Sequence, residues 1–351
     1  MQPSEGEPAV ASVVLGQFTK LGAWALSLVG MATQAVAADM LLAFDFRDAA
    51  VAGPGKGDLQ QIGVMISPAS ATPEERSGFG DRYFRRIAAP GLGPYSGQTF
   101  WRQAKAVPLE FTALAAYPLG QGLTKWNWGK SDFHFSDEGF FGKETKYLGM
   151  DKLGHALGAY FYSDILTQRI AHNSADSTGA AITGSIMGLA IQLGTEIGDG
   201  FSPNQGFSPQ DMMFNTMGAG LSLLRNAVPG LADKLDFRFE YWKSEFSSFD
   251  PTSDYSGQKY LLALKLSGFE SFEDSPLRFF ELHAGYYARG VGDETAGNGV
   301  ARRREPYIGI GFNLQQLIKE TPAANSTPGL LAGRLLEYYQ PPYTYAASSM
   351  D

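Results

Sequence analysis

Apolar residues recur every three or four positions through residues 97–230, which is the spacing of amphipathic helices. Pro108 is expected to start or kink the first helical stretch, because proline lacks the amide proton that a helix interior needs. Three further helices are predicted, and they run from Asp151 to about His172, from Ser177 to about Gly200, and onward from Ser208.

The ends and the composition of these helices support the prediction. Ser208 is a good N-cap, since proline follows at the first helical position and an acid at the third. Glycine at position 200 is a common helix stop. The helix that ends there, from Ser177 to about Gly200, contains Gly179, Gly184 and Gly188. Neighbouring helices are therefore expected to approach this helix closely.

Beyond Pro229 the pattern changes to strict alternation of apolar and polar residues, which is typical of strands. Four segments alternate in this way, namely DFRFEY (236–241), KYLLALKLSG (259–268), RFFELHAGYYAR (278–289) and PYIGIGFNL (306–314). Gly, Asp, Ser and Pro fill the gaps, so an antiparallel meander is expected. A closed single-chain outer-membrane barrel is disfavoured, because it needs at least about eight strands.

These patterns predict an α+β fold, a helical bundle followed by an antiparallel four-stranded β-meander and a C-terminal helix. The bundle occupies residues 97–230, the sheet 236–318, and the last helix with its tail 319–351. Residues 39–96 are rich in Gly, Pro and Ala and are expected to form irregular covering structure.

Residues 1–38 have the layout of a signal peptide or N-terminal anchor. An apolar run from Leu21 to Met31 follows a lysine, and small residues near Ala37 form a cleavage site. The segment before the run departs from this layout, because residues 1–19 contain two acids and no base. Either translation begins later and the segment is cleaved, or it is an uncleaved anchor.

Composition narrows the class of protein. The net charge of −8 and the pI of about 5.1 argue against nucleic acid as a partner. A mean hydropathy of −0.15 is too polar for a polytopic helical membrane protein, while 42 glycines and 13 % aromatic residues suit a cell-envelope protein. The sequence contains no cysteine, which excludes disulfides, thiolate metal sites, a cysteine nucleophile and a lipid-modified N-terminal cysteine.

Each of the three central helices carries a polar pair four residues apart, and so on one helical face. The pairs are Asp151 with His155, Gln192 with Glu196, and Asp211 with Asn215, and Asp199 follows Glu196 by three residues. Buried carboxylates are costly unless a cation, hydrogen bonds or a metal compensates them. If the three faces converge, they form a cluster that Lys152 can also join.

Three interpretations of this cluster stay open. The first is a divalent metal site for Zn, Mn or Fe, with ligands drawn from Asp151, His155, Glu196, Asp199 and Asp211. The second is a metal-free catalytic site in which His155 and Glu196 exchange protons beside Asp151. The third is a buried network that fixes helix register, with Lys152, Gln192 and Asn215 as members and Asp211 capping its own helix. The sequence has no G-x-S-x-G, P-loop or H-E-x-x-H motif.

Other polar residues carry weaker signals. His134 lies between two phenylalanines and is expected in an aromatic cover over the bundle rather than in the site. His283 is expected to be a solvated strand residue. The bases Arg302, Arg303 and Arg304 are expected to form a solvated turn, with contact to anionic lipid head groups as the alternative.

The order W…F-x-F-x-D…MDKLGHALGAY, TEIGDGF and FSPQDMMFNTMGAG resembles the YfiM-like predicted periplasmic lipoproteins, a family of unknown function. A looser pattern of the same residues is similar to the VanZ-like membrane proteins. The resemblance covers roughly residues 110–225, and it assigns no chemistry to the shared positions. These positions correspond to Asp151, Lys152, His155, Glu196, Asp199, Asp211 and Asn215. The chain departs from the lipoprotein pattern in having no cysteine to acylate.

The sequence therefore predicts an exported cell-envelope protein, periplasmic or associated with the outer membrane of a Gram-negative-type envelope. The leading hypothesis is a non-catalytic structural or interaction protein. The alternative is a metal-dependent or acid–base hydrolase acting on an envelope lipid or cell-wall component. The envelope membrane or an envelope protein is the expected partner, and nucleic acid is not.

Overall fold

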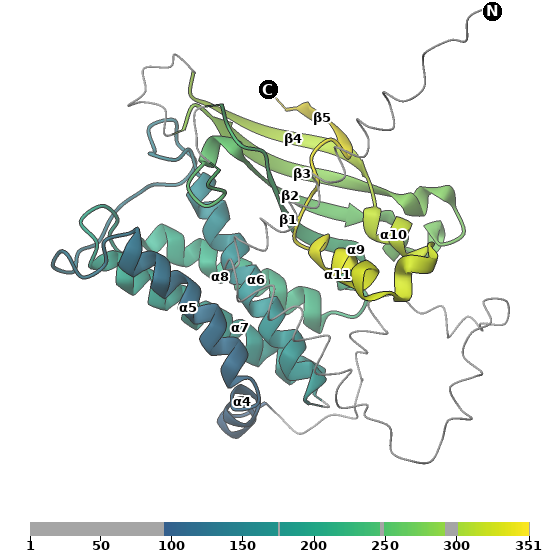
Figure 1. Ribbon diagram of the computed structural model, residues 1–351, viewed down its shortest axis with the longest axis horizontal. Coiled ribbons are helices and arrows are strands. Elements are labelled where there is room, and N and C mark those ends of the chain that lie inside the picture. The colour runs from purple at the N-terminus through teal and green to yellow at the C-terminus, as the bar shows by residue number, and fades with distance from the viewer. Residues whose placement is uncertain (1–94, 175, 246–248, 292–300, 351) are drawn as a thin grey trace, which may run out of the picture. The chain divides into compact units, whose positions relative to one another are not determined.

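The computed structural model describes residues 95–174, 176–245, 249–291 and 301–350. These residues form a helical bundle followed by an antiparallel sheet (Figure 1), which confirms the predicted α+β class. The expected signal peptide or anchor at residues 1–38, and all but the end of the irregular region at 39–96, lie outside the described residues.

Five helices make up the bundle, and their bounds follow the sequence signals closely. They are α4 (Gly97–Ala104), α5 (Pro108–Thr124), α6 (Met150–His172), α7 (Ser177–Gly200) and α8 (Pro209–Ala227). Pro108 occupies the first turn of α5, and the hydroxyl of Ser208 accepts a hydrogen bond from the amide of Asp211 at 3.2 Å. The long helix α6 is central, because α7 and α8 both pack along it.

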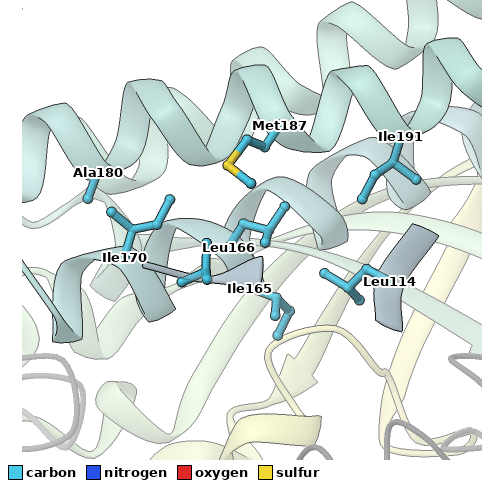
Figure 2. Packing of buried hydrophobic residues seen from close by; sticks show 8 residues of the cluster. Leu114, Ile165, Leu166, Ile170, Ala180, Met187 and Ile191 are labelled. Atoms are coloured by element: carbon cyan, nitrogen blue, oxygen red, sulfur yellow. The ribbon is translucent and has the colours of Figure 1, made fainter. Parts of the chain in front are cut away.

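Apolar side chains from three helices form the core of the bundle. The cluster contains Leu114 of α5, Ile165, Leu166 and Ile170 of α6, and Ala180, Met187 and Ile191 of α7 (Figure 2). Leu166, Ile170 and Ala180 are fully buried. Burial of such side chains stabilises the fold by roughly 1.5–3 kcal/mol each for the larger ones.

Glycines let the helices approach more closely than side chains would allow, as the sequence predicted for α7. A Cβ atom at Gly184 would lie 2.5 Å from the backbone nitrogen of Thr167, and one at Gly188 would lie 2.6 Å from that of Ser163. On the other side of α6, a Cβ at Gly218 of α8 would meet the carbonyl oxygen of Ala156 at 1.9 Å. The polar faces of the three helices are therefore held close together.

The sheet has five strands, not the four predicted. In spatial and chain order they are β1 (Leu235–Tyr241), β2 (Gln258–Lys265), β3 (Phe280–Arg289), β4 (Arg303–Phe312) and β5 (Tyr345–Ser349), all antiparallel. The prediction missed β5 because its sequence, YAASS, consists mainly of alanine and serine, which have little strand preference. Its place is set by pairing with β4.

Shorter elements connect and flank the strands. The described part of the chain has three short helices, α9 (Leu231–Lys234), α10 (Leu314–Lys319) and α11 (Thr327–Leu335), and the last of these is the predicted C-terminal helix. Single 3₁₀ turns occupy Tyr255–Gly257, Leu266–Gly268, Glu270–Phe272, Pro276–Phe279 and Pro322–Asn325.

One face of the sheet is apolar and its first strands rest on the bundle. The ring of Phe237 in β1 packs edge-on against Tyr160 of α6, at 5.8 Å between ring centroids. Farther along the same face, Leu282, Ile308 and Ile310 are exposed.

The opposite face of the sheet buries charged residues, and this corrects the prediction for His283. That side chain is buried rather than solvated, and its Nε2 lies 2.8 Å from Oε1 of Glu281. Arg238 donates to the same carboxylate and to Asp236 on β1. Alternation alone could not reveal this arrangement. The sequence pattern of a strand is the same whether its polar side chains are solvated or form ion pairs with one another.

Arg225 of α8 joins the bundle to the sheet. Its guanidinium lies 3.3 Å from a carboxylate oxygen of Asp164 on α6, 3.0 Å from Asp236 on β1 and 2.9 Å from Glu337 after α11. All of these side chains are buried or nearly so. The bundle and the sheet therefore share a charged network as well as an apolar contact.

Two of the three consecutive arginines at the start of β4 hold a loop, which corrects the prediction of a solvated turn. Arg302 donates to the carbonyl oxygens of Thr145 at 2.6 Å and Lys146 at 3.1 Å, and Arg304 donates to that of Phe141. Only Arg303 is exposed. The loop that precedes α6 is thus fixed to the sheet.

Candidate metal centre in the helical bundle

The ends of three helices bring the predicted polar pairs together. The α6 segment begins beside the point where α7 ends, and a short turn then leads directly into α8. The hydrogen bonds of Gln192 link all three helices, since its Nε2 donates to Oδ1 of Asn215 at 2.7 Å and to the carbonyl oxygen of His155 at 3.1 Å. The convergence that the i,i+4 spacing implied is therefore present.

His155, Glu196 and Asp211 form the centre of the cluster. The imidazole Nδ1 of His155 lies 3.3 Å from Oε1 of Glu196, and its Nε2 lies 3.8 Å from Oδ2 of Asp211. One donor atom from each residue lies within 4.8 Å of the other two. The imidazole side chain keeps 21 % of its surface exposed, while the two carboxylates are buried. The three side chains have the donor types and the spacing of a divalent metal site.

Each carboxylate has one oxygen held by the protein. The amide of Ser208 donates to Oε2 of Glu196 at 3.2 Å, and the ammonium of Lys152 lies 2.8 Å from Oδ1 of Asp211. The remaining Glu196 oxygen, Oε1, and the Nδ1 atom of His155 make no hydrogen bond among the described residues. These two atoms face one another without the alignment of a hydrogen bond.

Lys152 sits at the centre of a second group of carboxylates. Its Nζ lies 2.6 Å from Oε2 of Glu138 and 2.8 Å from Oδ2 of Asp151, in addition to Asp211. Burial alone would lower the pKa of Lys152, but Asp151 and Asp211 outweigh that effect and raise the pKa. Glu138, Asp151 and Asp211 also have the spacing of a metal group, and the ammonium occupies the place of the cation.

The cluster contains more carboxylates than cations. As a result, most of the carboxyl groups whose pKa values are shifted have raised pKa values. Burial raises the pKa of Glu196 to about 8 and that of Asp199 to about 6. Burial, together with Asp211, raises the pKa of Glu138 to about 7. Burial also opposes the charge of His155, but Asp211 and Glu196 overcome it and raise the histidine pKa to about 9.

Asp211 is the exception among these acids. Burial works against its ionised form, but His155 and Lys152 prevail and lower its pKa. Asp211 is therefore the carboxylate that stays ionised, and it faces both cations of the cluster. The Ser208 hydroxyl caps α8 as predicted, but Asp211 does not cap the helix in return, because the Ser208 amide donates to Glu196 instead.

The metal-free chain is expected to lose stability as the pH rises from about 5 to about 9. The raised pKa of His155 contributes stability that is complete below 6.5 and is lost as the pH passes 9. The raised pKa of Glu196 acts in the same direction, because an unfolded glutamate ionises above 4.5 and the buried one resists ionisation until about 8. The lowered pKa of Asp211 acts in the opposite direction, but it changes stability only at acid pH, below about the ordinary value of 3.8. Urea unfolding in EDTA at several pH values measures the trend, and a steady rise in stability from pH 5 to 9 would contradict it.

Not every predicted site residue lies in the central group. Asp151 faces Lys152 and Glu138 rather than His155. Asp199 accepts a hydrogen bond from the indole Nε1 of Trp128 at 2.8 Å and stands outside both metal groups. Lys152, Gln192 and Asn215, which the sequence suggested as members of a register-fixing network, are all buried.

The sequence interpretation missed Glu138, because it lies in the loop before α6 and follows no helical period. Its one signal was its position among aromatic residues in SDEGFF, directly before the polar start of α6. His134, from the same loop, is exposed and belongs to neither group. The neighbouring rings of Phe133 and Phe135 pack on Phe207, which agrees with the predicted aromatic cover.

A comparison with known families bears directly on this cluster. A family model described as "Predicted periplasmic lipoprotein (DUF2279)" matches residues 137–227. The match confirms the resemblance that the motifs indicated, and it supports a periplasmic location. It spans α6, α7, α8 and the loop with Glu138, so every residue of the two metal groups lies inside it. No curated protein and no solved structure matches the chain.

Proposed function

We propose that this exported envelope protein binds a divalent metal ion through His155, Glu196 and Asp211, and uses it to hydrolyse an envelope lipid or cell-wall component. The observation that carries the proposal is the buried Oε1 atom of Glu196, which has no hydrogen-bond partner among the described residues. The nearest polar atom across from it, Nδ1 of His155 at 3.3 Å, also makes no hydrogen bond among the described residues. Leaving a buried carboxylate oxygen without a hydrogen bond costs free energy, and a network that only fixed helix register would form that bond.

The surrounding contacts suit a metal site. Ser208 and Lys152 each hold one oxygen of a carboxylate and leave the other directed toward His155. Such outer contacts orient metal ligands in proteins. His155, Glu196 and Asp211 would hold the ion through three donor atoms, and a divalent ion held there would supply Lewis-acid chemistry that activates water near neutral pH. Glu138, whose side chain is 20 % exposed, is a candidate proton acceptor.

The second candidate is the non-catalytic structural or interaction protein. It is favoured by the hydrogen bonds of Gln192 and the ion pairs of Lys152, which tie the three helices together without any metal. The two candidates differ in whether His155 and Glu196 bind a ligand, and so a measurement of metal content separates them.

Purified chain, stripped with EDTA and reloaded with Zn²⁺ or Mn²⁺, is expected to retain about one ion per molecule after gel filtration. His155→Ala and Glu196→Gln should lose the ion, while His134→Ala, the matched exposed histidine, should keep it. Absence of bound metal in a folded wild-type chain at saturating ion would overturn the metal site. Release of fatty acid from phospholipid vesicles, or of fragments from peptidoglycan, tests the hydrolase separately. Metal binding without metal-dependent turnover of either substrate would reject that activity.

A further inference from the structure

The helices α5, α7 and α8 turn uncharged surfaces to the outside. Together they contain five charged residues, and none of the five is exposed. These residues are Glu110, Glu196, Asp199, Asp211 and Arg225. A bundle in water normally has the reverse arrangement, with charges outside and apolar residues inside.

Large apolar side chains take the exposed positions instead. Nine of them on these helices are 40–63 % exposed, namely Leu109, Leu119, Leu123, Ile186, Leu193, Ile197, Met213, Met217 and Leu224. Exposed threonines do not make the surface polar, because the hydroxyls of Thr112, Thr124 and Thr216 donate to carbonyl oxygens four residues earlier in their own helices. The surface therefore offers few groups that need water.

The three helices adjoin one another. Helix α7 contacts both α5 and α8, and all three helices contact α6, in which only the last residue, His172, is exposed. From Leu109 to Leu123 on α5, and from Met213 to Leu224 on α8, the exposed apolar residues span about 15–20 Å at 1.5 Å per residue. By length and composition α7 is long and apolar enough to cross a membrane, a property that core helices of water-soluble proteins share. The combined face of three helices is the more specific observation.

Aromatic and basic residues stand at the margins of this face. Trp101 is 63 % exposed just before α5, and Phe135 is 69 % exposed beside the end of α7. Arg102 and Lys105 are exposed next to Trp101, in a segment from residue 95 to 109 that contains no acid. Tryptophan, arginine and lysine are the residues that accompany the head groups of anionic lipids.

We infer that the α5–α7–α8 face inserts into the acyl chains of one leaflet of an anionic membrane, with Arg102 and Lys105 at the head groups. Contact is one-sided, because the opposite side of α6 rests on β1 through Tyr160 and Phe237, and Arg225 joins the same sheet. Lipid therefore covers one side of the bundle and does not surround it. This inference is independent of the metal site.

The absence of cysteine makes a direct test simple, because each label goes to one introduced position. The full chain carrying Ile186→Cys, Leu193→Cys or Met217→Cys is spin-labelled and bound to vesicles of phosphatidylethanolamine and phosphatidylglycerol. We expect all three labels to be accessible to oxygen, which concentrates in the acyl region, and poorly accessible to a water-soluble nickel chelate. Glu273→Cys, an exposed acid beyond β2, is the control and should be accessible to the chelate.

Two results would overturn the inference. One is chelate accessibility at Ile186, Leu193 and Met217 equal to that of the control. The other is protection of these labels from both reagents with spin–spin broadening, which would identify a second copy of the chain as the occupant. The wild-type chain should float more with the anionic vesicles than with phosphatidylcholine vesicles, and a double Arg102→Glu, Lys105→Glu variant should lose this preference. A preference for anionic vesicles that is unchanged in the variant would contradict the contact of Arg102 and Lys105 with the head groups.

Discussion

Replacing Lys152 with methionine is expected to lower the free energy of unfolding of the metal-free chain by roughly 3–5 kcal/mol at pH 8, the usual cost of removing one partner from a buried ion pair. The ammonium contacts Glu138, Asp151 and Asp211, and it is itself 1 % exposed. Methionine has a similar length but no charge, so three carboxylates would face one another. At pH 5 the loss should be smaller, because Glu138, whose pKa is about 7, can then be protonated.

The same variant should gain a metal site. Oxygen atoms of Glu138, Asp151 and Asp211 lie within 4.8 Å of one another, and carboxylates are preferred ligands of Ca²⁺ and Mn²⁺. Adding such an ion at 100 times its Kd should restore about 2.7 kcal/mol. Urea unfolding with and without the ion measures both effects. The control is Lys130→Met, at an exposed lysine in the loop between α5 and α6. It should change the free energy of unfolding by less than about 0.5 kcal/mol. Equal effects of the two substitutions would show that Lys152 does not hold the carboxylates.

The sequence predicted the central group of the site because local rules govern its parts. Helical spacing placed Gln192 and Glu196 on one face of α7, and the Ser208 cap fixed where α8 begins. A short connection between the two helices then requires them to be neighbours. These rules act over a few residues, and no tertiary contact opposes them here.

Other features depend on contacts between segments that are distant along the chain. The sequence pattern could not predict these contacts. Glu138 reaches the site because Arg302 and Arg304, more than 150 residues away along the chain, hold the loop that leads from Glu138 to α6. His283 is buried because the polar face of the sheet contains its own ion pairs. The β5 strand exists because β4 offers it an edge. In each case the decisive partner lies in another element, and periodicity describes one element at a time.

The membrane-facing inference and the metal proposal share a physical cause. If the outward surfaces of α5, α7 and α8 contact lipid, their polar residues must point toward α6, and that is where the carboxylates gather. A cluster of acids inside the bundle then needs compensation from within. Lys152 supplies part of it, and Oε1 of Glu196, 3.3 Å from the His155 imidazole, has no hydrogen bond among the described residues. The buried acids and the apolar exterior are thus two consequences of one distribution of residues.

Replacing Gly218 with alanine is expected to destabilise the chain by roughly 1–3 kcal/mol and to weaken metal binding. The added Cβ would lie 1.9 Å from the carbonyl oxygen of Ala156, so α8 must move away from α6. Ala156 is adjacent to His155, and α8 carries Asp211, so the movement separates two proposed ligands.

The control lies two residues further along the same helix. A Cβ at Gly220 meets no atom within 4 Å, so Gly220→Ala should instead stabilise the chain by about 0.5–1 kcal/mol through its higher helix propensity. Thermal unfolding and the retained Zn²⁺ per molecule are measured for both variants. If both substitutions stabilise the chain and both retain the ion, close packing of α8 on α6 is not what positions Asp211 beside His155. Opposite signs, with metal lost only from Gly218→Ala, would tie the site to the helix spacing.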